Sequence, residues 1–330
     1  MRPAAGALGA GVILGGLAQA AAPPPIVGGA RTQAHPAVGA LVAYDASRGG
    51  ASFCSGTLID ARWVVTAAHC LEAMNQYRTQ GFDLVVVFGD DIFTEAGIID
   101  AVYASSWTLH PDYGGEAVLP PVADVGVVRL DRAARDVEAL PMNTDAPSSR
   151  WLDADLTLVG WGLTSDDAND AGRKRAVDVP VDSYDGDFVY VWSPGTNVCQ
   201  GDSGGAALLP DEDGALVLAG IHSFVFSEDA SVPPCAEGGA GAYRVDKMVS
   251  WIRNQMEADA GAGGGGVGGG GVRSAGGGLP VEESRQGCAT SPLPSPPGAW
   301  LGVGLVAGLC GRRRVRRGGR DPQAGRPPTG

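Results

Sequence analysis

The chain has 330 residues, 44% of them hydrophobic, and a formal net charge of −13. The length allows one or two domains, and the apolar fraction is that of an ordinary globular protein. Asp and Glu outnumber Lys and Arg by 37 to 24, and a run of arginines begins only at Arg312, so the body of the chain is more acidic than the total. This charge argues against nucleic acid and anionic membranes as partners, and we expect it to serve solubility outside the cell rather than a functional acidic patch.

The N-terminus has the three parts of a secretory signal peptide. Met1-Arg2 gives a basic start, an apolar run follows to about Leu17, and small residues continue to Ala22. We therefore assign residues 1–22 to a signal peptide and the prolines at 23–25 to a short propeptide stub. A buried helix is the alternative, and the glycine-rich run at the start of the chain disfavours it. Export would permit disulfides.

From Ile26 to about Val245 the pattern is one of short apolar segments separated by Gly, Pro, Asn and Asp. Many short strands with few helical stretches predict an all-β barrel or sandwich. The clearest predicted strands are 38–44, 62–66, 84–88, 125–130, 156–159 and 215–221.

A helix is predicted at 246–256, near the end of this region. Met248, Trp251, Ile252 and Gln255 fall on one face at helical spacing. Asp246 precedes them, and we expect it to serve as the N-cap.

The C-terminal part divides into a Gly-rich flexible linker at 258–287 and a tail at 288–330. The tail holds Cys288, a proline-rich spacer, an apolar stretch at 299–311 and the arginines that follow it. The stretch is shorter than the roughly 20 residues of a membrane-spanning helix. This order of parts resembles short C-terminal sorting tags on exported proteins of some Gram-negative bacteria. The resemblance implies anchoring at the cell surface with processing or lipid attachment near Cys288, and a disordered tail or a plain membrane anchor are the alternatives.

Four cysteines lie in the body of the chain, at Cys54, Cys70, Cys199 and Cys235. An even number in an exported domain suggests two disulfides, although the sequence leaves three pairings open. We expect Cys54–Cys70 and Cys199–Cys235. A cysteine metal site is less favoured because no CxxC spacing occurs.

Three local patterns carry residues suited to catalysis. His69 follows an apolar strand, Asp124 opens another, and Ser203 lies among glycines. A serine hydroxyl becomes a good nucleophile only when a base takes its proton, and imidazole titrates near neutral pH. A carboxylate then holds the imidazole in the right tautomer. Each residue alone has an ordinary explanation as a structural histidine, a turn aspartate or a glycine turn, but the order His, Asp, Ser matches one known arrangement of a catalytic triad.

Five segments together resemble the trypsin/chymotrypsin family of serine proteases, over a stretch from Ile26 to about Met256. They are Ile26-Val27-Gly28-Gly29, Thr66-Ala67-Ala68-His69-Cys70, the Asp124 segment, Gly160-Trp161-Gly162 and Gly201-Asp202-Ser203-Gly204-Gly205. The resemblance implies two packed six-stranded antiparallel β-barrels with the active site between them and a C-terminal helix. It also implies that His69 is the general base, Asp124 orients it, Ser203 attacks the substrate carbonyl, and the N–H groups of Gly201 and Ser203 form the oxyanion hole.

The resemblance further implies activation by cleavage before Ile26, whose new ammonium pairs with Asp202. The preceding residue is Pro25, where family members often have arginine or lysine. We therefore expect an activating peptidase of a different kind to trim the stub.

In the family the main selectivity residue lies six positions before the catalytic serine, which is Asn197 here. A neutral residue at this position disfavours a preference for Arg or Lys. Val225 on the pocket wall and Gly241 at its back suggest a narrowed pocket for small or medium uncharged residues such as Ala, Val or Leu. The alternative is that Val225 is a strand residue pointing elsewhere.

Asp90, Asp91 and Glu95 lie where some relatives carry a calcium loop, but the spacing is loose and favours a solvated acidic loop. We expect no metal and no cofactor. The sequence thus predicts a serine endopeptidase acting on proteins or peptides, exported and secreted or anchored at a bacterial cell surface, with a monomeric catalytic domain. The alternative function is that of a catalytically inactive homologue that binds a protein from the cell surface.

Overall fold

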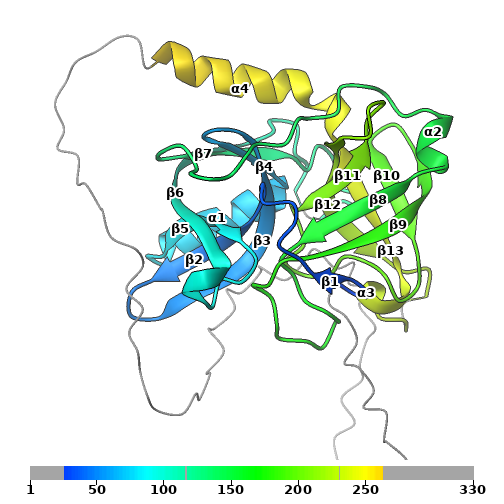
Figure 1. The fold of residues 1–330 in the computed structure, drawn as a ribbon, viewed down its shortest axis with the longest axis horizontal. Coiled ribbons are helices and arrows are strands. Elements are labelled where there is room, and N and C mark those ends of the chain that lie inside the picture. Colours follow the sequence, from blue (N-terminus) through cyan, green and yellow to red (C-terminus); the bar gives the residue numbers. More distant parts are fainter. Residues whose placement is uncertain (1–25, 116, 230, 263–330) are drawn as a thin grey trace, which may run out of the picture.

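A computed structural model describes residues 26–115, 117–229 and 231–262. Two six-stranded antiparallel barrels lie side by side, the first built from the N-terminal half of the described chain and the second from the C-terminal half (Figure 1). The predicted fold class is confirmed. The predicted signal peptide, the stub, Cys288 and the sorting tail lie outside the described residues.

The first barrel closes in the strand order β2-β3-β4-β7-β6-β5. Its interior is filled mainly by Val, Leu and Phe from every strand, as expected for strands whose alternate residues face inward. The strands are β2 (Val38–Asp45), β3 (Gly49–Asp60), β4 (Trp63–Thr66), β5 (Asp83–Gly89), β6 (Ile98–Leu109) and β7 (Gly126–Leu130).

The second barrel has the order β9-β10-β13-β12-β11-β8 and closes by pairing of β8 with β9. A short strand, β1 (Ala30–Arg31), adds to the free edge of β9 and so places the start of the described chain against this barrel. The strands are β8 (Asp155–Gly160), β9 (Arg175–Tyr184), β10 (Phe188–Trp192), β11 (Ala206–Pro210), β12 (Leu216–Phe226) and β13 (Gly239–Arg244).

The predicted strands at 38–44, 62–66, 84–88, 125–130, 156–159 and 215–221 correspond to β2, β4, β5, β7, β8 and β12 within a few residues at each end, the largest difference being that β12 continues to Phe226. Both expected disulfides form, with Cys54 bonded to Cys70 and Cys199 to Cys235.

The helices are few and short. The predicted C-terminal helix is α4 (Val249–Ala262), which follows the 3₁₀ turn η2 (Val245–Lys247). Asp246 is therefore not the N-cap of α4: it lies within η2, and its carboxylate accepts a hydrogen bond of 2.6 Å from Arg244. The helix also continues beyond residue 257, into the predicted linker. The remaining helical segments are α1 (Ala68–Thr79), η1 (Glu95–Gly97), α2 (Ser149–Leu152) and α3 (Pro234–Glu237).

Helix α1 was not expected from the sequence. Leu71 and Met74 are buried one helical turn apart against the first barrel. Among the described residues, no helix is long and apolar enough to cross a membrane.

Candidate active site

The strand pairing of the first barrel brings His69 and Asp124 to the same place. Strands β4 and β7 are antiparallel neighbours, and Thr66 at the end of β4 lies opposite Gly126 at the start of β7. His69 follows β4 as the second residue of α1, and Asp124 lies two residues before the start of β7. Segments that follow one strand and precede its antiparallel neighbour lie at the same edge of the sheet, which brings His69 and Asp124 close together.

Asp124 holds His69 through both of its oxygens. Oδ2 lies 2.8 Å from the ring Nδ1, and Oδ1 accepts the backbone N–H of His69 at 3.0 Å. The two contacts fix the position and the plane of the imidazole. With Nδ1 carrying a proton toward the carboxylate, Nε2 is the nitrogen left to act as a base.

A third donor reaches the same carboxylate from the second barrel. The hydroxyl of Ser223, in β12, donates to Oδ2 of Asp124 at 2.6 Å. Asp124 is fully buried, and burial raises its pKa, but the charge and hydrogen bonds of His69 and the hydrogen bond of Ser223 together hold the pKa below its usual range. Asp124 is therefore a carboxylate at neutral pH.

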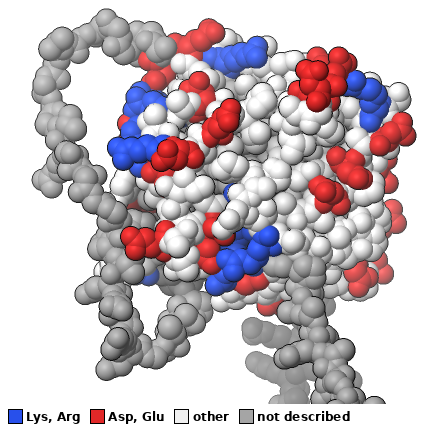
Figure 2. All heavy atoms as spheres, in the orientation of Figure 1, with Lys and Arg blue, Asp and Glu red and all other residues white. Residues whose placement is uncertain are grey.

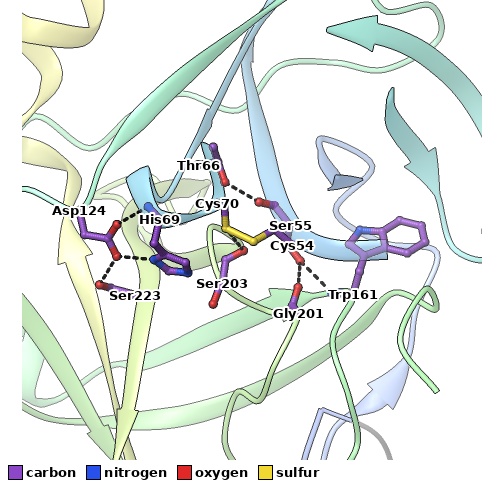
Figure 3. Close-up of a disulfide and its surroundings, with 10 residues drawn as sticks. All are labelled: Cys54, Ser55, Thr66, His69, Cys70, Asp124, Trp161, Gly201, Ser203 and Ser223. Carbon is purple, nitrogen blue, oxygen red and sulfur yellow. Dashed lines mark hydrogen bonds and ion pairs between the residues drawn. A yellow bond between two sulfur atoms is a disulfide. The ribbon is translucent and has the colours of Figure 1, made fainter. Parts of the chain in front are cut away.

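Ser203 comes from the second barrel, in the loop that precedes β11. Figure 3 shows the imidazole of His69 between the carboxylate of Asp124 and Ser203. The backbone of Ser203 is attached to the first barrel, because its carbonyl accepts the N–H of Ser55 at 2.8 Å and faces Sγ of Cys70 at 3.5 Å.

Ser55, in β3, organises this loop with all of its polar groups. Its hydroxyl donates to the carbonyl of Gly201 at 2.9 Å and accepts the N–H of Trp161 at 3.0 Å. Its carbonyl accepts the hydroxyl of Thr66 at 2.7 Å. Figure 3 shows these bonds linking the serine loop to β3 and β4.

Gly204 must be glycine for two reasons. Its φ is +77°, where other residues are strained, and a Cβ there would lie 2.0 Å from Oγ1 of Thr66. The carbonyl orientations and the glycine turn leave the N–H groups of Gly201 and Ser203 without an acceptor among the described residues.

Asp202, just before Ser203, is a second buried carboxylate. It accepts the N–H of Gly162 at 2.7 Å and the N–H of Cys199 at 2.8 Å. Burial raises its pKa to about 7, against the opposing effect of these two donors and of Arg175. A Cβ on Gly160 would lie 2.2 Å from Oδ1 of Asp202, which explains why this glycine flanks the carboxylate.

The start of the described chain docks near this carboxylate. Ile26 is fully buried, and Val27 forms a β-bridge with Asn197, whose N–H donates to the carbonyl of Val27 at 2.9 Å. Asn197 precedes Asp202 by five residues, so the segment that begins at Ile26 lies against the loop that carries Asp202.

The three residues expected in the specificity pocket do not share one surface. Asn197 is 1% exposed, and both ends of its amide are used, because Nδ2 donates to the carbonyl of Pro234 at 3.2 Å and Oδ1 accepts the N–H of Val198 at 2.9 Å. Val225 is buried and belongs to the same apolar cluster as Val198.

Gly241 lies on a different face of the sheet from Val225. Directly opposed residues of antiparallel strands share a face. Val225 lies opposite Ala240, whereas Gly241 lies opposite Phe224, whose ring would be 2.5 Å from a Cβ on Gly241. The strand register therefore places Val225 and Gly241 on opposite faces of the sheet, and not in one pocket as expected.

Of the acidic residues considered for calcium, Asp91 has other partners. Oδ2 of Asp91 is 2.7 Å from Arg31 and 3.3 Å from Arg173, and Oδ1 accepts the N–H of Phe93 at 2.9 Å. Within the described ranges, the His, Cys and acidic groups that cluster closely enough for a metal each include both cysteines of a disulfide, whose sulfurs are already bonded.

Two polar residues of the site were missed in the sequence. The sequence motifs assign no role to Ser223 or to Ser55. Both are hydroxyls on strands, Ser55 in β3 and Ser223 in β12, and both are buried. A buried hydroxyl needs a partner, and this was the available signal.

Comparison with known proteins agrees with this geometry. The sequence model of the trypsin family, described as "Trypsin", matches residues 26–252. A trypsin of Saccharopolyspora erythraea is 34% identical over 252 residues, covering 71% of this chain and 100% of that protein. Serine protease 1 of Rattus norvegicus is 31% identical over 252 residues, covering 71% of this chain and 91% of that protein. Brachyurin of Leptuca pugilator is 27% identical over 206 residues, covering 62% and 87%. The chain belongs to the trypsin family of serine endopeptidases.

Proposed function

We propose that the protein is a serine endopeptidase in which His69, Asp124 and Ser203 form the catalytic triad. The observation that carries the proposal is the 2.8 Å contact between Nδ1 of His69 and a fully buried, ionised Asp124. His69 takes the proton of the Ser203 hydroxyl as Oγ attacks the peptide carbonyl, and Asp124 stabilises the imidazolium. The same proton then goes to the leaving amine, and water hydrolyses the acyl-enzyme.

The N–H groups of Gly201 and Ser203 would stabilise the oxyanion. The hydrogen bonds of Ser55 to the carbonyls of Gly201 and Ser203 support this role, because they fix the peptide planes of the loop before substrate arrives. Donors that are already oriented toward the developing charge need no reorganisation during the reaction.

The test is covalent labelling with a fluorophosphonate, followed by mass mapping of the adduct. We expect an adduct on Ser203 that is lost in Ser203→Ala and in His69→Ala, and loss of peptide hydrolysis in both variants. Asp182→Asn, at an exposed position of β9, is a control that should keep both activities. A folded protein that begins at Ile26 and takes no label would favour the inactive binding homologue instead.

Activation is proposed to follow cleavage between Pro25 and Ile26. Burial of Ile26 and the bridge from Val27 to Asn197 support it. An ammonium group on Ile26 would lie in the same barrel as the buried Asp202. A buried carboxylate is stabilised by such a partner. N-terminal sequencing of the active protein should give Ile26 as the first residue. A protein that retains the prolines and is as active as the form beginning at Ile26 would contradict a role for cleavage in activation.

The substrate residue before the cleaved bond is proposed to be small or medium-sized and uncharged. Asn197 supports this preference, since it is neutral and the protein itself uses its amide groups. A peptide library should be cleaved after Ala, Val or Leu, and cleavage dominated by Arg or Lys would refute the proposal.

Export and anchoring are proposed from the two ends of the chain, with residues 1–22 as signal peptide and 288–330 as the anchoring tail. The two disulfides are in keeping with an oxidising compartment. The catalytic domain is proposed to be a monomer. Cell fractionation should find the full chain at the cell surface and a chain ending at residue 287 in the medium. Light scattering of the purified domain checks that it is a monomer.

A further inference from the structure

The buried carboxylate of Asp202 needs a positive partner even before cleavage. Its two N–H donors, from Gly162 and Cys199, are neutral, and a buried ionised carboxylate without a nearby cation is costly. The ammonium proposed above does not exist while Ile26 is still bonded to Pro25. The loop of Gly201 and Ser203 is held by the hydrogen bonds that Ser55 makes to their carbonyls, and these bonds do not involve Ile26.

A buried arginine, Arg175, is linked to Asp202 through hydrogen bonds that both side chains make to Gly162. Arg175, at the start of β9, is 2% exposed, and its Nη1 donates to the carbonyl of Gly162 at 2.9 Å. The N–H of the same Gly162 donates to Oδ1 of Asp202 at 2.7 Å. Gly162 is thus held between the guanidinium on one side and the carboxylate on the other.

The two charges also act on each other directly. Burial raises the pKa of Asp202 and lowers that of Arg175, and in each case the charge of the other residue opposes the effect of burial. Arginine stays protonated even when buried. Asp170, which is partly exposed, also pairs with Arg175 at 3.1 Å and holds the outer side of the guanidinium.

Stability alone does not account for Arg175. Its Nε has no hydrogen-bond partner among the described residues, and a buried polar group left unpaired destabilises the native state. Replacing a buried ion pair by apolar residues is often neutral or stabilising. The positive charge of Arg175, which acts on Asp202, is a contribution that an apolar side chain could not supply.

We propose that Arg175 is a positioning residue that provides an internal countercharge for Asp202, so that the oxyanion loop is already formed while residues before Ile26 remain attached. The inference rests on the proposed function of Ser203 as nucleophile. It gives the uncleaved chain substantial activity of its own, with cleavage adding a second cation to the same carboxylate. The residue before Ile26 is Pro25 and not Arg or Lys. This matters less for function if the protein is partly active before the Pro25–Ile26 bond is cleaved.

The experiment compares two forms of the protein, one with the Pro25–Ile26 bond intact, verified by intact mass, and one beginning at Ile26. The rate of fluorophosphonate labelling and kcat/KM for a neutral peptide are measured for wild type, Arg175→Gln, Arg175→Lys and the control Arg173→Gln, whose side chain is partly exposed. We expect uncleaved wild type to react within about tenfold of the cleaved form. Arg175→Gln should slow the uncleaved form by about tenfold or more and the cleaved form only about two- to threefold, because the cleaved form has its own ammonium.

Arg175→Lys keeps the charge and should retain most of the labelling of the uncleaved form, which separates a charge effect from loss of packing. Arg173→Gln should match wild type in both forms. An inert uncleaved wild type would overturn the inference, and so would an equal loss in both forms of Arg175→Gln with a matching loss of Tm. Wild type that is unlabelled in both forms would overturn the proposed nucleophile and this inference with it.

Discussion

At the scale of single residues, the site depends on which atom donates to which. Asp124 accepts three hydrogen bonds, from the backbone N–H and Nδ1 of His69 and from the hydroxyl of Ser223. In each of these bonds Asp124 must supply the oxygen that accepts the hydrogen. The position therefore tolerates a carboxylate and not the amide of the same shape.

Asp124→Asn should lower kcat by about 10⁴. Either orientation of the amide points its NH₂ group at a donor from His69 or Ser223, and the imidazole then takes the wrong tautomer for accepting the proton of Ser203. The measurement is kcat on a neutral peptide at saturating substrate, with Asp182→Asn as the control. A loss below about tenfold would remove Asp124 from the proposed triad.

Two buried titrating groups give the stability of the uncleaved chain opposite dependences on pH. Burial raises the pKa of Asp202 from 3.8 to about 7, so between those values the native state holds a proton that the unfolded state has released, and the free energy of unfolding falls as pH rises. Burial lowers the pKa of His222 from 6.5 to about 3. Between those pH values the unfolded state binds a proton at His222 and the native state does not, so the free energy of unfolding falls as pH falls.

Because the two effects oppose each other in wild type, the effect of Asp202 is visible only as a difference. The Tm of Asp202→Asn should rise relative to that of wild type as pH increases from about 4 to about 7. Thermal unfolding of both proteins at several pH values in this window makes the comparison. A difference in Tm that is constant across the window would show that Asp202 does not titrate there.

At the scale of elements, the sequence predicts strands well and their exact pairing poorly. The motifs around His69, Asp124 and Ser203 are local in the chain, so they identify the candidate triad without any knowledge of register. The shared face of Gly241 and Phe224 depends on the irregularity between His222 and Phe224, where one residue of β12 has no counterpart in β13. Alternation along a sequence does not reveal such a bulge.

Helix α1 shows a second limit of the same kind. It follows β4 with no glycine, proline or capping side chain to mark its start, since its N-cap is Ala67 and makes no side-chain hydrogen bond. The disulfide between Cys54 and Cys70 ties the first turn of this helix to β3. The disulfide thus supports the turn that carries His69.

Replacing both Cys54 and Cys70 by Ala should lower the free energy of unfolding by about 3 kcal/mol, as expected for a loop of this size. The sequence separation is 16 residues. Urea unfolding followed by tryptophan fluorescence measures the loss, with Cys288→Ala as the control outside the protease domain. An unchanged unfolding midpoint would mean that the packing of α1 alone fixes its first turn.

At the scale of the whole molecule, the site exists only where the barrels meet. His69 and Asp124 come from the first barrel, and Ser203 and Ser223 from the second. Trp161 helps to hold them together, since its indole N–H, from the second barrel, donates to the carbonyl of Val38 in β2 at 3.0 Å. The family motifs predicted this arrangement, but the contacts across the barrels, such as that of Ser55 with the serine loop, required the structure.

Acidic side chains predominate on part of the molecular surface. On the face shown in Figure 2, Asp and Glu side chains are spread along the second barrel with few basic side chains among them, and the formal net charge is −13. A negative field raises the local concentration of cationic substrates at low ionic strength, and salt screens it over about 10 Å at 0.1 M.

Peptides with lysines placed away from the cleaved bond should therefore be cleaved with a kcat/KM that falls about threefold to tenfold between low salt and about 0.5 M salt. The same peptides with glutamine in place of lysine should show little change. Because the proposed pocket is neutral, the effect should appear for lysines in flanking positions and leave the preferred residue before the cleaved bond unchanged. Equal salt dependence for both peptides would mean that the acidic surface serves solubility and does not take part in attracting substrate.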